Sequence, residues 1–92
     1  MTDVYRLKIS DLAQRQIKAI PSNYVRSEII DEIAALRDDP YPPGSQLEED
    51  LLHRHRLKLN GWRIIYKVDE EDRLITILTV RKRNRNTYLN VP

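Results

Sequence analysis

The chain begins with an alternation of apolar and polar residues. Tyr5, Leu7 and Ile9 are separated by single polar residues, and a period of two is typical of a strand with one buried face. We therefore predict a half-buried strand over residues 3–9.

Two helices are predicted between this strand and a proline-rich loop. Ser10 can cap the first helix, and an apolar stripe runs along it until Pro21 ends it: Leu12, Ala13, Ile17 and Ile20. Ser22 or Asn23 can cap the second helix, whose apolar stripe continues to the break at Asp38-Asp39-Pro40: Val25, Ile29, Ile30, Ile33 and Leu36. Residues 40–44 contain three prolines within four positions, which predicts an extended surface loop.

Three strands are predicted in the second half of the chain, and the first two form a hairpin. Alternating runs over residues 53–59 and 62–68 flank Asn60-Gly61, a dipeptide that type I′ turns favour because both central residues need positive φ. The acidic segment 69–72 turns the chain again before a β-branched strand over 74–80. The order β-α-α-β-β-β indicates an α+β fold, a mostly antiparallel four-stranded sheet with two N-terminal helices packed on it. At 92 residues we expect a single domain, 1–92.

A two-residue turn also predicts which hairpin residues face each other. Lys58 then lies opposite Arg63, and Leu59 lies opposite Trp62. Alternation gives an apolar face, which packs on the helices and consists of Leu57, Leu59, Trp62, Ile64, Tyr66 and Val68. The basic residues take the other face: Arg54, Arg56, Lys58, Arg63 and Lys67. Directly opposed like charges weaken a sheet, so this arrangement predicts an anion above the basic face.

Composition narrows the class of protein. The net charge of +2 is unevenly distributed. Residues 1–52 carry 6 Lys/Arg and 10 Asp/Glu, a net charge of −4, whereas residues 53–92 carry 10 Lys/Arg and 4 Asp/Glu, a net charge of +6. A basic half suits a polyanionic partner. With no cysteine and two histidines, we expect no metal site and no cofactor. No apolar run is long enough to span a membrane and the N-terminus lacks a signal-peptide pattern, which favours the cytoplasm.

Further basic residues follow the last predicted strand and enlarge the candidate anion surface. Tyr88 lies at a distance that could return it to the same cleft, where it could stack on a base or hydrogen-bond a phosphate. The simpler alternatives are that the cations keep an exposed sheet face solvated and that Tyr88 covers the core. His53 and His55 project to the core side, with Glu48 or Glu49 nearby as candidate general bases. The added cations are Arg81, Lys82, Arg83 and Arg85.

A set of short motifs extends along nearly the whole chain: Tyr5–Ile9, Asp39-Pro40, His55-Arg56-Leu57-Lys58-Leu59, Gly61-Trp62-Arg63-Ile64-Ile65-Tyr66, and Val80-Arg81-Lys82-Arg83 before Tyr88. Together they resemble the RelE/ParE toxin superfamily. The resemblance implies a mostly antiparallel sheet with both helices against it, and a cognate acidic antitoxin protein that wraps the toxin. RelE-like members cut messenger RNA in the decoding (A) site of the ribosome, whereas ParE-like members poison DNA gyrase and lack the ribonuclease residues.

The resemblance to the RelE-like branch also implies working residues. The matching positions are Arg56, Lys58, Arg63, Arg83 and Tyr88. It implies a ribosome-dependent endoribonuclease, an mRNA interferase in which a ribose 2′-hydroxyl attacks the adjacent phosphate without a metal. Other cations would bind the RNA: Arg54, Lys67, Arg81, Lys82 and Arg85. Other relatives use a Glu/His pair, for which Glu49 and His55 are candidates, and a gyrase inhibitor or an inactive regulatory module are alternative functions.

Overall fold

The computed structural model describes residues 4–43, 45–48 and 54–82. These residues form seven elements, which are β1 (Arg6–Ile9), α1 (Asp11–Lys18), α2 (Asn23–Ala35), β2 (Gln46–Glu48), β3 (Arg54–Leu59), β4 (Trp62–Asp69) and β5 (Leu74–Lys82). The strand order in the sheet is β1-β5-β4-β3-β2. β1 runs parallel to β5, and the other neighbouring strands are antiparallel.

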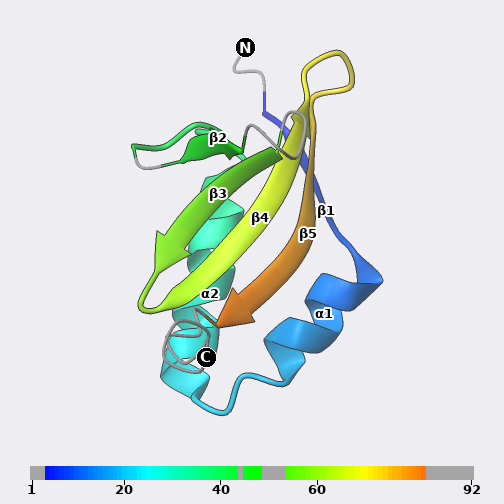
Figure 1. Cartoon of the computed structure of the whole chain (residues 1–92). Coiled ribbons are helices and arrows are strands. Elements are labelled where there is room, and N and C mark those ends of the chain that lie inside the picture. The colour runs from blue at the N-terminus through cyan, green and yellow to red at the C-terminus, as the bar shows by residue number, and fades with distance from the viewer. Residues whose placement is uncertain (1–3, 44, 49–53, 83–92) are drawn as a thin grey trace, which may run out of the picture.

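The predicted α+β class is confirmed, with both helices N-terminal and the sheet mostly antiparallel. Figure 1 shows α2 behind the sheet, with α1 below β1 and beside the end of β5. The opposite face of β3, β4 and β5 carries neither helix, and we call it the outer face (Figure 1). The four predicted strands are β1, β3, β4 and β5. Sequence reasoning missed β2, because three residues are too few for a periodic pattern to show.

Serine side chains begin both helices. The Ser10 Oγ accepts a hydrogen bond from the Ala13 amide at 3.0 Å, and the Ser22 Oγ accepts one from the Val25 amide at 3.2 Å. Each bond satisfies one of the amides that a first helical turn leaves without a partner. Ser22 is therefore the cap of α2, and Asn23 is its first residue. Neither helix is long and apolar enough to cross a membrane, within the residues that the structure describes.

The core lies between the sheet and the helices. Two predicted core residues, Leu12 and Ile30, are exposed instead, with 46% and 47% of their surface accessible. Their neighbours Ala13 and Ile29 occupy the core positions, and one residue along a helix turns a side chain by about 100°. The buried residues are Tyr5, Ala13, Ile17, Ile20, Ile29, Ile33, Leu36, Leu57, Ile64, Tyr66, Ile75, Ile77 and Val80.

The β3–β4 hairpin follows the prediction. Asn60 and Gly61 have φ of 49° and 81°, so both central residues of the turn are left-handed. Lys58 pairs with Arg63, Leu59 with Trp62, and the register continues to Arg54 and Lys67. The predicted apolar face is also confirmed, because all six of its residues belong to the core or pack against it.

A bulge in β5 was not predicted, and it changes which residues face outward. Ile65 pairs with Thr79 whereas Tyr66 pairs with Ile77, so Leu78 is an extra residue in β5. α1 supplies partners for the backbone here. The Ser10 hydroxyl donates to the Leu78 carbonyl at 2.9 Å, and the Gln16 Oε1 accepts from the Val80 amide at 2.7 Å. These two bonds hold the bulge in place, since buried backbone groups need partners.

Because of the bulge, alternation in β5 shifts by one residue. Ile75 and Ile77 face the core, and after the extra residue it is Val80 that is buried. Arg81 consequently comes to the outer face as the register partner of Arg63. An unbroken strand would have pointed Arg81 toward the core.

Candidate nucleic-acid interface

Three basic residues on three neighbouring strands form a row across the outer face. Arg63 in β4 is the register partner of Lys58 in β3 on one side and of Arg81 in β5 on the other. We call Lys58, Arg63 and Arg81 the first row. Adjacent strands are about 4.8 Å apart, so the backbone positions of the three basic residues lie within a width of about 10 Å.

Much of the first row is open to solvent. Lys58 and Arg81 are exposed, and Arg63 is half-buried. Among residues 4–43, 45–48 and 54–82, no carboxylate forms an ion pair with any of the three. At the tip of the hairpin, residues 58–63 line a hollow of about 130 Å³.

The other predicted sheet residues share this face. Arg56 is half-buried beside Ile65, and Arg54 and Lys67 are exposed partners one pleat further along. Ile65 is only 9% accessible although it lies on the outer face. All five basic residues predicted from the hairpin therefore project from one surface, with Ile65 among them.

The structure does not bring every predicted residue to this surface. Lys82 is the register partner of Trp62, which packs against the core, so Lys82 stands on the helix side at the exposed end of β5. His55 is also on the helix side, as the register partner of buried Tyr66. Five further predictions lie outside the described residues and remain predictions: Arg83, Arg85, Tyr88, Glu49 and His53.

The position of His55 bears on the alternative Glu/His chemistry. Its ring lies 5.1 Å from that of Tyr41 and 5.4 Å from that of Tyr66, in a stacked arrangement with the second. The sheet separates this aromatic group from the first row, since Lys58 and Arg63 project from the opposite face. His55 and the first row therefore cannot act on the same phosphate in this arrangement.

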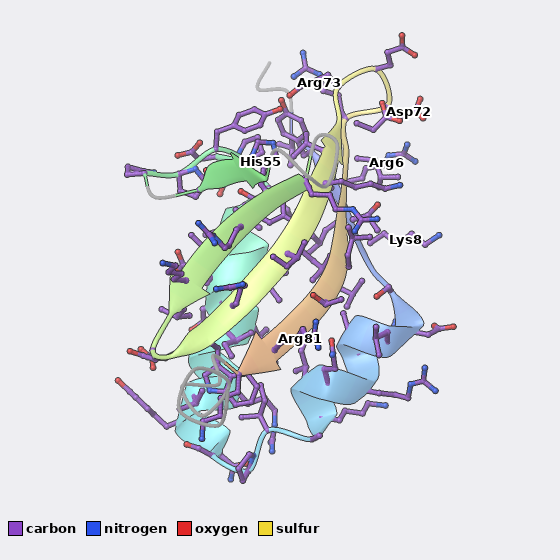
Figure 2. The ribbon with its side chains drawn as sticks, in the orientation of Figure 1. Arg6, Lys8, His55, Asp72, Arg73 and Arg81 are labelled. Atoms are coloured by element: carbon purple, nitrogen blue, oxygen red, sulfur yellow. The ribbon has the colours of Figure 1, made fainter. Side chains whose placement is uncertain are left out.

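Sequence reasoning missed two cations at the far edge of the sheet. Lys8 is the register partner of Thr76, and Arg6 is the partner of Leu74. Both are exposed, and Figure 2 shows them extending from the β1 edge. Arg6 and Lys8 are the polar positions of the alternating N-terminal strand. The alternation does not show, however, that this strand lies beside β5.

A second group of polar side chains lies at the β4–β5 turn, and its role is structural. The Tyr5 hydroxyl donates to Glu70 Oε1 at 2.8 Å, and the Tyr41 hydroxyl donates to Glu70 Oε2. Arg73 donates to the Tyr5 oxygen at 2.9 Å and lies over the Tyr5 ring. The group thus ties the start of β1 and the proline-rich loop to the turn.

These hydrogen bonds shift the acidity of the participating groups. The bonds from Tyr41 and Tyr5 lower the pKa of the Glu70 carboxyl, because they stabilise its charged form. The pKa of the Tyr5 hydroxyl is raised by its bond to Glu70, and the pKa of Tyr41 is raised by burial and then by the same carboxylate. Between mildly acidic and mildly alkaline pH, the Glu70 carboxyl is charged and both tyrosine hydroxyls keep their protons. The hydrogen bonds of the group are therefore all present in this range.

Comparison with known proteins defines the class to which this fold and surface belong. The family described as "ParE toxin of type II toxin-antitoxin system, parDE" matches residues 7–87. The chain belongs to this family, and it is a toxin of a type II toxin-antitoxin system within the RelE/ParE superfamily. No curated protein sequence matches it.

Solved toxin structures share the fold. The isolated E. coli RelE toxin superposes with a TM-score of 0.77 at 20% identity, covering 92% of each chain. RelE in the archaeal RelE-RelB complex of Pyrococcus horikoshii gives 0.75 at 26% identity, over 92% of this chain and 99% of the other. A chain of the chromosomal ParDE system of P. aeruginosa gives 0.72 at 17% identity, over 89% and 99%. Structural likeness thus extends to both branches of the superfamily.

Proposed function

We propose that this toxin is a ribosome-dependent endoribonuclease that cuts messenger RNA and so stops translation. The observation that carries the proposal is the first row, in which Lys58, Arg63 and Arg81 lie side by side on an open face with no carboxylate pairing them among the described residues. A sheet that holds like charges in register is weakened by them. A phosphate backbone above the row would relieve that repulsion.

In the proposed reaction, a ribose 2′-hydroxyl attacks the neighbouring phosphate. A bond forms between the 2′-oxygen and phosphorus, the bond to the 5′-oxygen breaks, and the products carry a 2′,3′-cyclic phosphate and a 5′-hydroxyl. Lys58 takes the 2′-hydroxyl proton, a role open to lysine only in its neutral form. Arg63 stabilises the charge that grows on the phosphoryl oxygens, and Arg56 stands one pleat away for the same purpose.

Two residues outside the described part of the chain complete the proposal. Arg83 would add a second guanidinium to the phosphoryl oxygens, and Tyr88 would hold a base or donate to the leaving 5′-oxygen. Arg81 already supplies one cation from β5 beside Arg63. Because these groups act mainly by charge and position, the ribosome must orient the substrate, and free RNA should be cut slowly.

We further propose that the partner in the cell is a cognate acidic antitoxin that covers the basic face. Several structurally similar toxins were solved as complexes with an antitoxin, including RelBE2 of Mycobacterium tuberculosis and the RelE-RelB complex of Pyrococcus horikoshii. An acidic segment would neutralise the same row that RNA would bind. Action on translating ribosomes places the protein in the cytoplasm.

The matched family supports a second candidate function. It is the ParE toxin family, and the ParDE system of P. aeruginosa is among the similar structures. In that case the toxin would inhibit DNA gyrase without cutting nucleic acid. The first row favours the nuclease, because Lys58 and Arg63 retain both the positions and the residue types that the resemblance assigns to RNA cleavage.

A paired assay separates these functions. Purified toxin and its Arg63→Ala variant are added to ribosomes programmed with a defined message, and to gyrase in a supercoiling assay. Lys18→Ala, an exposed lysine on α1, is the matched control. We expect cleavage of the ribosome-bound message by wild type and control, a loss of at least 100-fold with Arg63→Ala, and no effect on gyrase.

Other outcomes of this assay are distinct. Inhibition of gyrase without RNA cleavage would establish the second candidate. No effect in either reaction would indicate a toxin fold that has become a regulatory module. Equal cleavage by wild type and Arg63→Ala would show that a different surface carries the chemistry.

A further inference from the structure

The outer face carries a second line of cations, parallel to the first row. Thr76 in β5 is the register partner of Lys67 in β4 on one side and of Lys8 in β1 on the other. We call Lys67, Thr76 and Lys8 the second row. The two lysines are exposed and Thr76 is half-buried, whereas Leu7 and Ile75, one residue away, face the core side. The second row therefore joins segments from both ends of the chain on the solvent side of the sheet.

The spacing between the rows suits a nucleic-acid strand. Arg63 and Lys67 are four residues apart on β4, and a strand rises about 3.4 Å per residue, so the rows are about 14 Å apart. Successive nucleotides of a stacked strand advance about 3.4 Å. A phosphate on the second row would accordingly be a few nucleotides from one on the first row. Between the rows, Ile65 and Thr79 carry no charge on β4 and β5, and Arg56 is the register partner of Ile65 on β3.

The ionic partners of the second row can be judged within the described residues. Lys8 and Lys67 form no ion pair within the part of the chain that is described. Asp69 ends the basic surface two residues beyond Lys67, and its carboxylate accepts the amide of Asp72 in the turn. On β3, Arg54 is the register partner of Lys67, and we do not count it in the second row.

We infer that the second row is a separate phosphate-binding subsite, which holds the RNA backbone a few nucleotides from the phosphate on the first row. The inference rests on the proposed function, since it extends the same surface. Lys67 and Lys8 would neutralise the phosphate and Thr76 would donate a hydrogen bond. The subsite binds and takes no part in bond breaking, so it contributes affinity for longer RNA.

The test measures binding to RNA that cannot be cleaved. Full-length toxin is titrated with fluorescent 2′-O-methyl oligoribonucleotides of three and eight nucleotides, at several salt concentrations. Lys8→Gln, Lys67→Gln and the double variant are compared with Lys18→Gln, which removes an exposed lysine from α1. We expect the double variant to lower the salt slope for the longer RNA by about 0.7, the value for one phosphate, and each single variant to lower it by less. The slope for the trinucleotide should not change, and Lys18→Gln should match wild type.

Each remaining result overturns the inference in its own way. If the longer RNA binds equally well to wild type and double variant, the second row is not a subsite, although the proposed function stands. If neither RNA binds, the proposed function fails as well. If the variants lose affinity for a polyglutamate peptide but not for RNA, the row serves a protein partner.

Discussion

Replacing Arg63 with glutamine should stabilise the fold while it weakens RNA binding at the first row. Arg63 is the middle residue of the first row, with Lys58 and Arg81 as direct partners on both sides. A favourable cross-strand pair contributes roughly 0.2–1 kcal/mol, and we take a cost of similar size for a directly opposed like-charge pair, which is destabilising. Removing the central charge relieves two such pairs. We expect a gain in the free energy of unfolding of about 1 kcal/mol at low salt, which is about 4–8 °C in Tm for a domain of this size.

The assay is thermal and urea unfolding at about 10 mM and 1 M salt. The Debye length falls from about 30 Å to about 3 Å over this range, so the gain should largely disappear at high salt. Lys18→Gln is the control of opposite sign, because Lys18 lies in the last turn of α1, where a cation is favourable. Equal or lower stability of Arg63→Gln at low salt would refute the view that the row is held against its own repulsion.

Three further predictions concern the scaffold. Tyr66→Phe should cost about 1–2 kcal/mol in urea unfolding, because the buried Tyr66 hydroxyl donates to the Pro40 carbonyl at 2.7 Å; an unchanged midpoint would argue against this bond. Ser10→Ala should destabilise the fold more than Ser22→Ala, since Ser10 both caps α1 and holds the bulge whereas Ser22 only caps α2; equal losses would count against the bulge contact. The pKa of Glu70 is lowered in the fold, so its contribution is present above the unfolded pKa near 4.5 and is lost as pH falls through the folded pKa. Acid unfolding of Glu70→Gln should therefore depend less on pH below 4.5 than that of wild type, and identical profiles would contradict this assignment.

Sequence reasoning succeeds here where local chemistry decides the outcome. Asn60-Gly61 determines the turn type, the turn determines the register, and the register places Lys58 opposite Arg63. The serine caps and most of the core follow in the same way from short-range pattern. These features depend on residues close together in the chain.

Long-range pairing explains what the sequence does not reveal. The bulge at Leu78 depends on Ser10 and Gln16, which reach β5 from α1 more than 60 residues earlier. Lys8 joins the basic surface only because β1 pairs with β5. Neither contact produces a periodic pattern in the sequence. The sequence therefore groups Arg81 with the basic residues around it but does not distinguish it from Lys82, which lies on the helix side of the sheet.

Binding of RNA to the first row can be located on the protein surface residue by residue. Backbone amide shifts of isotopically labelled toxin are followed by NMR while an uncleavable 2′-O-methyl trinucleotide is added. We expect the largest amide shift changes at Lys58, Arg63 and Arg81, which lie on three neighbouring strands of one face. Changes centred on α2, with those three amides unaffected, would contradict this expectation.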